Sequence, residues 1–280
     1  MLLCVSIALA LYPTISKKIN TALANSSVNL YTKSVDAMPK SQINEMFREA
    51  EQYNAELANT VRKDDTPIFN PKENYNNILN VSGNGIMGSI EIPVIDVRLP
   101  IYHGTDDEFL DEGAGHLIGT SFPIGGQNTH AVISAHTALP GKLFFDRLTD
   151  VKQGDIFYVK ILDRELEYRV TDIQVVLPSE SQSLSIVKDK DLVTLVTCTP
   201  YSINSHRLLV TGERIETSDT LAGGEDETIT ANTDSLPTKS NNLHHTIIMI
   251  GIAVLLIVFT LIVIVTTKRK KKTDEKTENE

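Results

Sequence analysis

The feature that most constrains this chain is an uninterrupted apolar run near its C-terminus. Ile247 to Val265 is a run of nineteen residues without a charge, about the length that crosses a bilayer as a helix. A basic cluster, Lys268 to Lys272, follows two threonines later, and such a cluster marks the cytoplasmic side of a span. We therefore expect a transmembrane helix at 247–265, a cytoplasmic tail at 266–280, and the bulk of the chain outside the cell.

The charge of the remaining chain argues against a nucleic-acid partner. The sequence holds 26 basic and 36 acidic side chains. Six of the basic and four of the acidic residues lie after residue 267, so the rest of the chain carries a net charge of about −12. Phosphate binding requires a basic surface. We therefore expect no nucleic-acid partner, and we interpret the basic cluster as an anchor signal.

The first residues are also apolar, but they form a shorter run. Met1 to Pro13 has no basic residue before it and meets Lys17 and Lys18 after it, whereas a secretory signal places its positive charge first. We expect residues 1–16 to be a membrane segment, either complete or lacking its first residues. The alternative is a signal peptide cleaved near the small residues at 22–24.

An amphipathic helix is expected next. Ser41 is an N-cap candidate just after Pro39, and the apolar residues beyond it recur at steps of three and four. These residues are Ile43, Met46, Phe47, Ala50, Tyr53, Leu57 and Val61. Residues 62–71 contain two aspartates, a phenylalanine and two prolines that forbid a continuing helix. We therefore expect 17–80 to be a helical region with a loop at 62–71.

Alternating apolar residues then predict strands. The alternation through Ile90 and Ile92 changes phase at Pro93, which suggests a bulge or bend. Further strand candidates are Ala131–Ala135, Ile156–Leu162, Leu166–Leu177, Leu192–Val196 and Arg207–Thr211. Only one short helical stretch, Leu143–Leu148, is expected among them. So many strands favour a closed β-barrel over an α/β sheet.

The limits of this domain follow from composition. Strand patterns occupy residues 81–216, which we assign to the barrel. Residues 217–246 are rich in Thr, Ser, Asn and acidic side chains, and such a segment buries too little apolar area to offset its ordering entropy. We expect it to be a tether between the barrel and the membrane.

One cysteine of the barrel has the surroundings of a nucleophile. Cys4 lies in the first apolar run, so Cys198 is the sole thiol of the main domain. Such a thiol is either an inert buried side chain or a reactive one. Cys198 ends a strand before Pro200, and Arg207 opens the next strand, so an antiparallel return brings the guanidinium beside the sulfur. A nearby positive charge favours the thiolate and stabilises an oxyanion.

A histidine that delivers a proton to the leaving amine would complete such a site. His136 ends the apolar strand Ala131–Ala135 and precedes a loop, the same strand-end placement as that of Cys198. His130 has the same strand parity but lies at the opposite end. His136 is therefore the preferred candidate.

The other histidines fit the role less well. His103 and His116 lie among glycines, where we expect exposed turns. His206 is adjacent to Arg207, and consecutive side chains on a strand point to opposite faces. The histidines show no ligand spacing typical of zinc, so we expect no metal site.

Three ordered motifs resemble the sortase family. Residues 194–198 read Thr-Leu-Val-Thr-Cys, which is similar to the sortase signature of Thr-Leu, any residue, Thr-Cys. Residues 199–210 resemble the class C branch, which assembles pili. Upstream, the resemblance extends through the segments 88–93, 99–104 and 130–137, so that it covers residues 40 to 215.

The resemblance implies a mainly β fold, with a sortase-type barrel of about eight strands and N-terminal helices. It implies that Cys198 is the nucleophile, that His136 donates and accepts the proton, and that Arg207 positions the scissile carbonyl and the oxyanion. Thr197 is expected to support the oxyanion through its backbone or hydroxyl, and an ordinary strand residue is the alternative. No cofactor is implied.

The resemblance also implies the partners and the location. The donor is an LPxTG-like sorting signal of a pilin, cleaved after Thr, and the acceptor is a lysine amine of another pilin. The enzyme would sit in the cell membrane with its catalytic domain on the extracellular face. The alternative function is a wall-anchoring sortase that uses a peptidoglycan amine.

Two rival interpretations are disfavoured. Leu236-Pro237-Thr238 resembles part of a sorting signal, which would make this chain a sorted pilin or adhesin, but Lys239 stands where Gly is needed. A papain-like protease requires a Cys-Gly-x-Cys context that the sequence lacks.

One segment departs from the class C pattern. Class C members carry Asp-Pro-aromatic in direct succession in a lid, whereas here Asp64, Asp65, Pro67 and Phe69 are spread over six residues. We expect a lid with an aspartate near Arg207 and Phe69 over the sulfur. A surface connector is the alternative.

Overall fold

The computed structural model describes residues 2–64, 74–180 and 182–215. Leu9–Ala222 forms one compact unit, to which all contacts below belong, and of the second unit only the start of the first helix is described. The expected tether, transmembrane span and cytoplasmic tail lie outside the described residues. None of the described helices is both long and apolar enough to cross a membrane.

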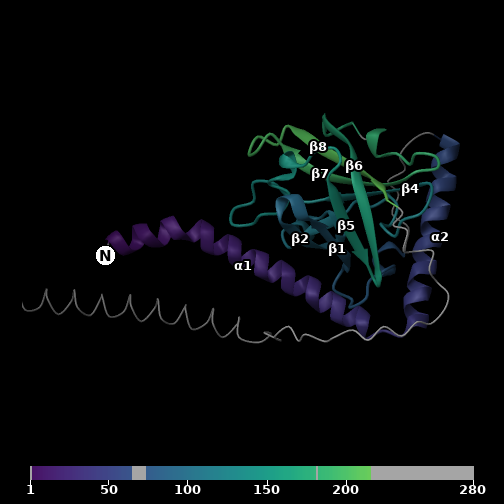
Figure 1. Cartoon of the computed structure of the whole chain (residues 1–280), viewed down its shortest axis with the longest axis horizontal. Coiled ribbons are helices and arrows are strands. Elements are labelled where there is room, and N and C mark those ends of the chain that lie inside the picture. Colours follow the sequence, from purple (N-terminus) through teal and green to yellow (C-terminus); the bar gives the residue numbers. More distant parts are fainter. Residues whose placement is uncertain (1, 65–73, 181, 216–280) are drawn as a thin grey trace, which may run out of the picture. The chain divides into compact units, whose positions relative to one another are not determined.

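Eight strands of the described chain form a closed barrel (Figure 1). They are β1 (Ile86–Ile92), β2 (Val97–His103), β3 (Ala114–His116), β4 (Thr129–Ser134), β5 (Ile156–Ile161), β6 (Arg164–Val176), β7 (Asp191–Thr199) and β8 (His206–Arg214). Their order is β1-β2-β3-β4-β7-β8-β6-β5, and β5 closes on β1. Only β2 with β3 and β4 with β7 are parallel pairs in this sheet. The predicted mainly β class and closed barrel are confirmed.

Alternating side chains fill the barrel, as the period of a strand requires. In β5, Phe157, Val159 and Ile161 are buried, whereas the residues between them are partly exposed. Phe157 stacks on Tyr168 of β6 with a centroid distance of 5.5 Å. The core therefore lies inside the barrel. Because its interior is filled, a functional site is expected at the ends of the strands.

The phase change at Pro93 is a chain reversal rather than a bulge within one strand. Residues Pro93–Ile95 form a 3-10 turn, η2, which Asp96 ends in a left-handed conformation with φ 55°. Strands β1 and β2 then pair antiparallel, with Ile92 opposite Val97. The proline starts the turn because its fixed φ suits the first position of a helical turn.

Other local predictions were wrong. The stretch Leu143–Leu148 is not helical and consists of turns before a 3-10 helix, η3 (Leu148–Asp150). A short helix, α3 (Asp107–Leu110), and strand β3 were not predicted, since each spans only three or four residues. Two more 3-10 helices, η1 (Tyr75–Asn77) and η4 (Gln182–Leu184), lie in connections.

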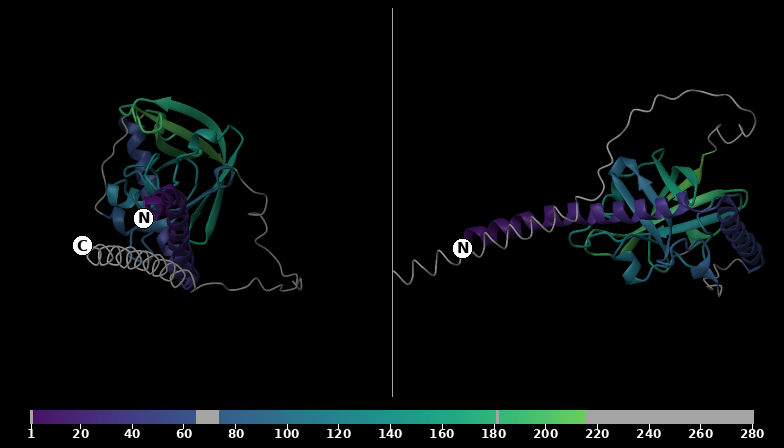
Figure 2. Two further views of the ribbon diagram at one scale, coloured as in Figure 1. Left: turned by 90° about the vertical axis from the view of Figure 1, so that its left-hand side faces the viewer. Right: turned by 90° about the horizontal axis from the view of Figure 1, so that it is seen from below.

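Two long helices precede the barrel and pack on different sides of it (Figures 1 and 2). Helix α1 (Leu2–Asp36) continues without a break through the boundary expected at residue 16. The Tyr31 hydroxyl of α1 donates to the Met87 carbonyl at 2.7 Å and accepts from the Leu162 amide at 2.8 Å. This buried double hydrogen bond fixes α1 to strand β1 and to the turn after β5.

Helix α2 (Lys40–Asp64) has the predicted amphipathic character. The side chains of Ile43, Phe47, Ala50, Tyr53 and Leu57 are buried against the barrel. The helix extends through Asp64, so the loop expected to begin at residue 62 begins later. Residues 65–73, which include Asp65 and Phe69, lie outside the described part of the chain.

Candidate active site

Cys198 and Arg207 lie opposite each other at the end of the β7–β8 ladder. Their Cα atoms are register partners in this antiparallel pair, so their side chains share one face and their Cβ atoms are about 5 Å apart. Both residues are partly exposed, and Cys198 is a free thiol. The structure thus places the guanidinium beside the sulfur, as the sequence predicted.

Arg207 is anchored by the turn that precedes it. Its Nη1 donates to the carbonyl of Asn204 at 3.2 Å and to the carbonyl of His206 at 3.1 Å. Among the residues that the structure describes, no carboxylate lies within ion-pair distance of Arg207. A guanidinium so placed can stabilise an anionic group that forms beside Cys198.

His136 reaches the same place from strand β4. The parallel β4–β7 register pairs Ser134 with Val196, so its continuation by two residues sets His136 beside Cys198. The preceding residue, Ala135, donates its amide to the Val196 carbonyl at 3.1 Å. His136 is therefore held at the strand end from which its side chain enters the cleft.

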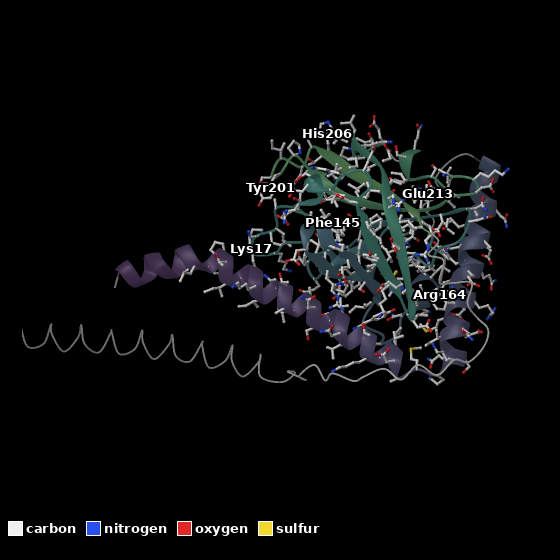
Figure 3. All side chains as sticks on the ribbon, viewed as in Figure 1. Lys17, Phe145, Arg164, Tyr201, His206 and Glu213 are labelled. Carbon is white, nitrogen blue, oxygen red and sulfur yellow. The ribbon has the colours of Figure 1, made fainter. Side chains whose placement is uncertain are left out.

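These three residues line one cleft of about 580 Å³. The remaining lining residues are mostly apolar and include Leu110, Leu117, Val132, Val176, Leu177, Leu184, Val196 and Leu209. Among the described residues that line the cleft, Glu180 is the one carboxylate, and its Oε2 accepts from the Leu177 amide at 3.0 Å. In Figure 3, Tyr201 marks the loop between β7 and β8, and His206 marks the first residue of β8, directly before Arg207. The cleft offers an apolar wall for a peptide side chain next to a thiol, an imidazole and a guanidinium.

Thr197 does not face this cleft. It is 3% exposed, and its hydroxyl donates to the Ala135 carbonyl at 2.8 Å. Because neighbouring side chains on a strand alternate, Thr197 points away from the side occupied by Cys198. Its hydroxyl ties β7 to the residue before His136, which the sequence did not indicate.

The expectation that His103 and His116 lie in exposed turns is wrong. They end strands β2 and β3 and are 3% and 0% exposed. The Tyr75 hydroxyl lies 2.8 Å from Nδ1 of His116, and Nε2 of His116 lies 2.8 Å from the Ser121 carbonyl. Burial lowers the pKa of His116 to about 3. Both rings belong to the core.

His130 is also a core residue. Its Nδ1 lies 2.8 Å from the Ser185 carbonyl and its Nε2 lies 2.7 Å from Oγ1 of Thr194. Burial lowers the pKa of His130. The side chain connects the start of β4 to the loop between β6 and β7, and it is excluded from the cleft. Among the described residues, no group of three or more His, Cys, Asp or Glu side chains is arranged to hold a metal ion.

The comparisons with known proteins agree with this geometry. Residues 90–215 match the family model described as the sortase domain. Sortase A of Streptococcus agalactiae is 31% identical over 137 residues, which are 48% of this chain, and the chain covers 55% of that relative, just over half its length.

Two solved structures match over more of the chain. Sortase C1 of GBS Pilus Island 1 is 37% identical with a TM-score of 0.65, and the match covers 69% of this chain and 98% of that one. Clostridium perfringens sortase C, solved with the C-terminal cell wall sorting motif, is 40% identical with a TM-score of 0.60, and the match covers 69% and 100%. This chain therefore belongs to the sortase family, on its class C branch.

Proposed function

We propose that this chain is a cysteine transpeptidase that joins pilin subunits. The observation that carries the proposal is the convergence of Cys198, His136 and Arg207 on one apolar cleft. A transpeptidase must hold an acyl group on a thiol, stabilise an oxyanion and exchange a proton with two different amines. The three side chains supply one group for each of these tasks.

In the first half-reaction, the Cys198 thiolate attacks the carbonyl carbon of Thr in an LPxTG-like sorting signal. Charge develops on the carbonyl oxygen, where the Arg207 guanidinium stabilises it. The Thr–Gly bond then breaks, His136 gives its proton to the leaving amine, and a thioester between Thr and Cys198 remains.

In the second half-reaction, a lysine amine of another pilin attacks the thioester. The neutral His136 accepts the proton from the attacking nitrogen, and Arg207 again faces the oxyanion. The C–S bond breaks, Cys198 leaves as the thiolate, and an isopeptide bond links the two subunits. The apolar lining limits the access of water, which competes for the same thioester.

The location and the remaining partners belong to the same proposal. The apolar span at 247–265 and the basic residues after it favour a membrane helix with a cytoplasmic tail, which leaves the barrel on the extracellular face. Thr197 supports the site through the backbone before His136, where its hydroxyl bonds. The lid role of Asp64, Asp65 and Phe69 stays a prediction from the sequence.

A wall-anchoring reaction, in which a peptidoglycan amine accepts the acyl group, is the second candidate. It shares the thioester with the pilin reaction and differs only in the amine that accepts the acyl group. The test is to incubate the full chain in detergent with a purified pilin that carries its sorting signal, and separately with a peptidoglycan amine. A ladder of covalent pilin oligomers supports the proposal, whereas a product with only the peptidoglycan amine supports wall anchoring.

A further inference from the structure

Residues 136–146, which follow β4 and begin with His136, form a loop that we call the His136 loop. The carboxylate of Asp146 accepts two hydrogen bonds from the backbone of this loop. Oδ1 of Asp146 accepts from the Ala138 amide at 3.1 Å, and Oδ2 accepts from the Phe144 amide at 3.2 Å. The Phe145 amide donates to the His136 carbonyl at 3.0 Å. Side-chain bonds to the backbone of this kind fix local chain conformation. The backbone of His136 therefore depends on the shape of the whole loop.

A second constraint reaches the His136 loop from helix α1. Nδ2 of Asn20 donates to the Gly141 carbonyl at 2.7 Å, across 121 residues of sequence. Gly141 has φ +78°, and a Cβ atom at this position would lie 2.2 Å from Oγ of Ser16. The helix therefore touches the loop at a point where only glycine permits so close an approach.

Helix α1 is a firm support because other contacts seat it on the barrel. The buried Tyr31 hydroxyl bonds both Met87 and Leu162. Nη1 of Arg98 donates to Oδ1 of Asn29 at 3.1 Å and to Oδ1 of Asn25 at 3.4 Å. Arg98 lines a pocket together with Thr21 of α1 and with Phe144 and Asp146 of the His136 loop. Asn20 is the α1 side chain whose hydrogen bond reaches the backbone of this loop.

We propose that α1 positions His136, with Asn20 as the positioning residue. Asn20 touches no reacting atom; it acts through Gly141 and the loop that Asp146 closes. The inference rests on the proposed function, in which His136 exchanges a proton beside Cys198. A small displacement of an imidazole slows proton transfer more than it weakens peptide binding, because binding depends on the apolar lining of the cleft. The contact should therefore control kcat rather than KM.

The test compares Asn20→Ala with Asn29→Ala in the full chain, both carrying Cys4→Ser so that Cys198 is the only thiol. Each variant removes one asparagine hydrogen bond between α1 and its surroundings, so the pair shares any effect on helix docking. Asn20→Asp is a third variant, which keeps the shape of the side chain but removes the donor. Three quantities are measured: kcat and KM for cleavage of a sorting-signal peptide, the rate of Cys198 alkylation by iodoacetamide, and Tm.

We expect Asn20→Ala and Asn20→Asp to lower kcat by roughly tenfold with KM changed less than about twofold. Alkylation should slow severalfold, because a displaced imidazole supports the thiolate less. The charged groups among the other described residues that line the cleft, Arg207 and Glu180, are untouched by these substitutions. Asn29→Ala should match the parent chain in kcat, KM and alkylation, with a similar Tm.

The proposal is overturned if the Asn20 and Asn29 variants have the same kcat and alkylation rate. It is also overturned if Asn20→Asp behaves like the parent chain, because α1 would then act by packing alone, or if KM changes and kcat does not. Failure of the parent chain to cleave the peptide refutes the proposed function instead. The alkylation rates then still decide whether Asn20 governs the surroundings of Cys198.

Discussion

Four of the five described histidines, all except His206, form two groups that differ in what surrounds the imidazole ring. His136 lies partly exposed in the cleft, and no described residue forms a hydrogen bond with its ring. His103, His116 and His130 are at most 3% exposed, and each has both ring nitrogens within hydrogen-bond distance of a protein atom. A ring whose nitrogens are both occupied cannot exchange a proton with a substrate. Only the first kind of environment leaves the imidazole available for chemistry.

The core group also differs in its proton affinity. Burial lowers the pKa of His103, although the two carbonyls of Gly85 and Ile78 that face its ring nitrogens act in the opposite direction. Burial dominates at His116 and His130 as well. A lowered pKa favours the neutral ring, in which one nitrogen donates to a neighbouring oxygen and so helps to satisfy buried polar groups. Substitutions should therefore separate the two groups: cleft variants should lose activity, and core variants should lose stability.

Cys198→Ala should produce the largest effect. Without the thiol no thioester forms, so covalent pilin products should be absent from a gel assay with the full chain. The side chain is only partly buried, so the free energy of unfolding should change by less than about 1 kcal/mol. Joined product from a folded alanine variant would show that Cys198 is not the nucleophile.

His136→Ala and His130→Ala provide the direct contrast between the groups. Loss of the cleft imidazole should lower kcat by about 10²- to 10⁴-fold, the range of a general acid and base. His130→Ala should keep kcat within about threefold but lower the free energy of unfolding by about 1–3 kcal/mol, because it removes the ring partner of the Ser185 carbonyl and one of the two partners of the Thr194 hydroxyl. Chemical denaturation and steady-state kinetics measure both quantities. A comparable loss of kcat in both folded variants would contradict the division.

Arg207→Lys tests whether charge alone is sufficient in the cleft. A lysine keeps the sign but loses the planar fork that contacts an oxyanion while bonding the carbonyls of Asn204 and His206. We expect kcat/KM to fall by more than about tenfold. Near-normal turnover would mean that the fork geometry has no role.

The sequence predicted that Cys198, Arg207 and His136 lie together because each residue stands at the end of an apolar run, and strand ends can be recognised in a sequence. Cys198 and Arg207 end and begin apolar runs on either side of a proline-containing turn, so the antiparallel register follows from the spacing. His136 follows an apolar run that turned out to be parallel to β7. Local patterns are sufficient where neighbouring strands share one end of a barrel.

His103 and His116 were misjudged because the glycines beside them were interpreted as turn signals. Gly115 lies within β3, where an added Cβ atom would come 2.2 Å from the Gly104 carbonyl. The residue permits two chain segments to approach closely, which no local pattern reveals. The Asn20 contact to Gly141 spans 121 residues and was equally invisible. Such contacts depend on packing between segments that are far apart in the chain, and a single sequence does not reveal which segments pack together.

Tyr75→Phe should act on the core group without affecting the cleft. The hydroxyl accepts from the Gly104 amide at 3.1 Å and lies 2.8 Å from Nδ1 of His116. Its removal leaves buried polar groups unpaired, so the free energy of unfolding should fall by about 1–3 kcal/mol with kcat unchanged. Tyr12→Phe, at a residue that is 63% exposed, is the matched control and should change stability by less than about 0.5 kcal/mol. Equal free energies of unfolding for the two variants would show that the Tyr75 hydroxyl does not stabilise the core.

The smallest effect should appear in the pH dependence of stability. His116 has a pKa of about 3 in the folded chain, against 6.5 when unperturbed, so the unfolded chain binds a proton between these values and the folded chain does not. Stability from this residue is therefore full above pH 6.5 and falls as the pH decreases toward 3, by about 1 kcal/mol between pH 6.5 and 5.5. His116→Gln keeps a donor for the Ser121 carbonyl but cannot titrate. Between pH 6.5 and 5.5, the free energy of unfolding should fall by about 1 kcal/mol more in the parent chain than in the variant, as measured by chemical denaturation. An equal fall in both chains would show that His116 accepts a proton in the folded core.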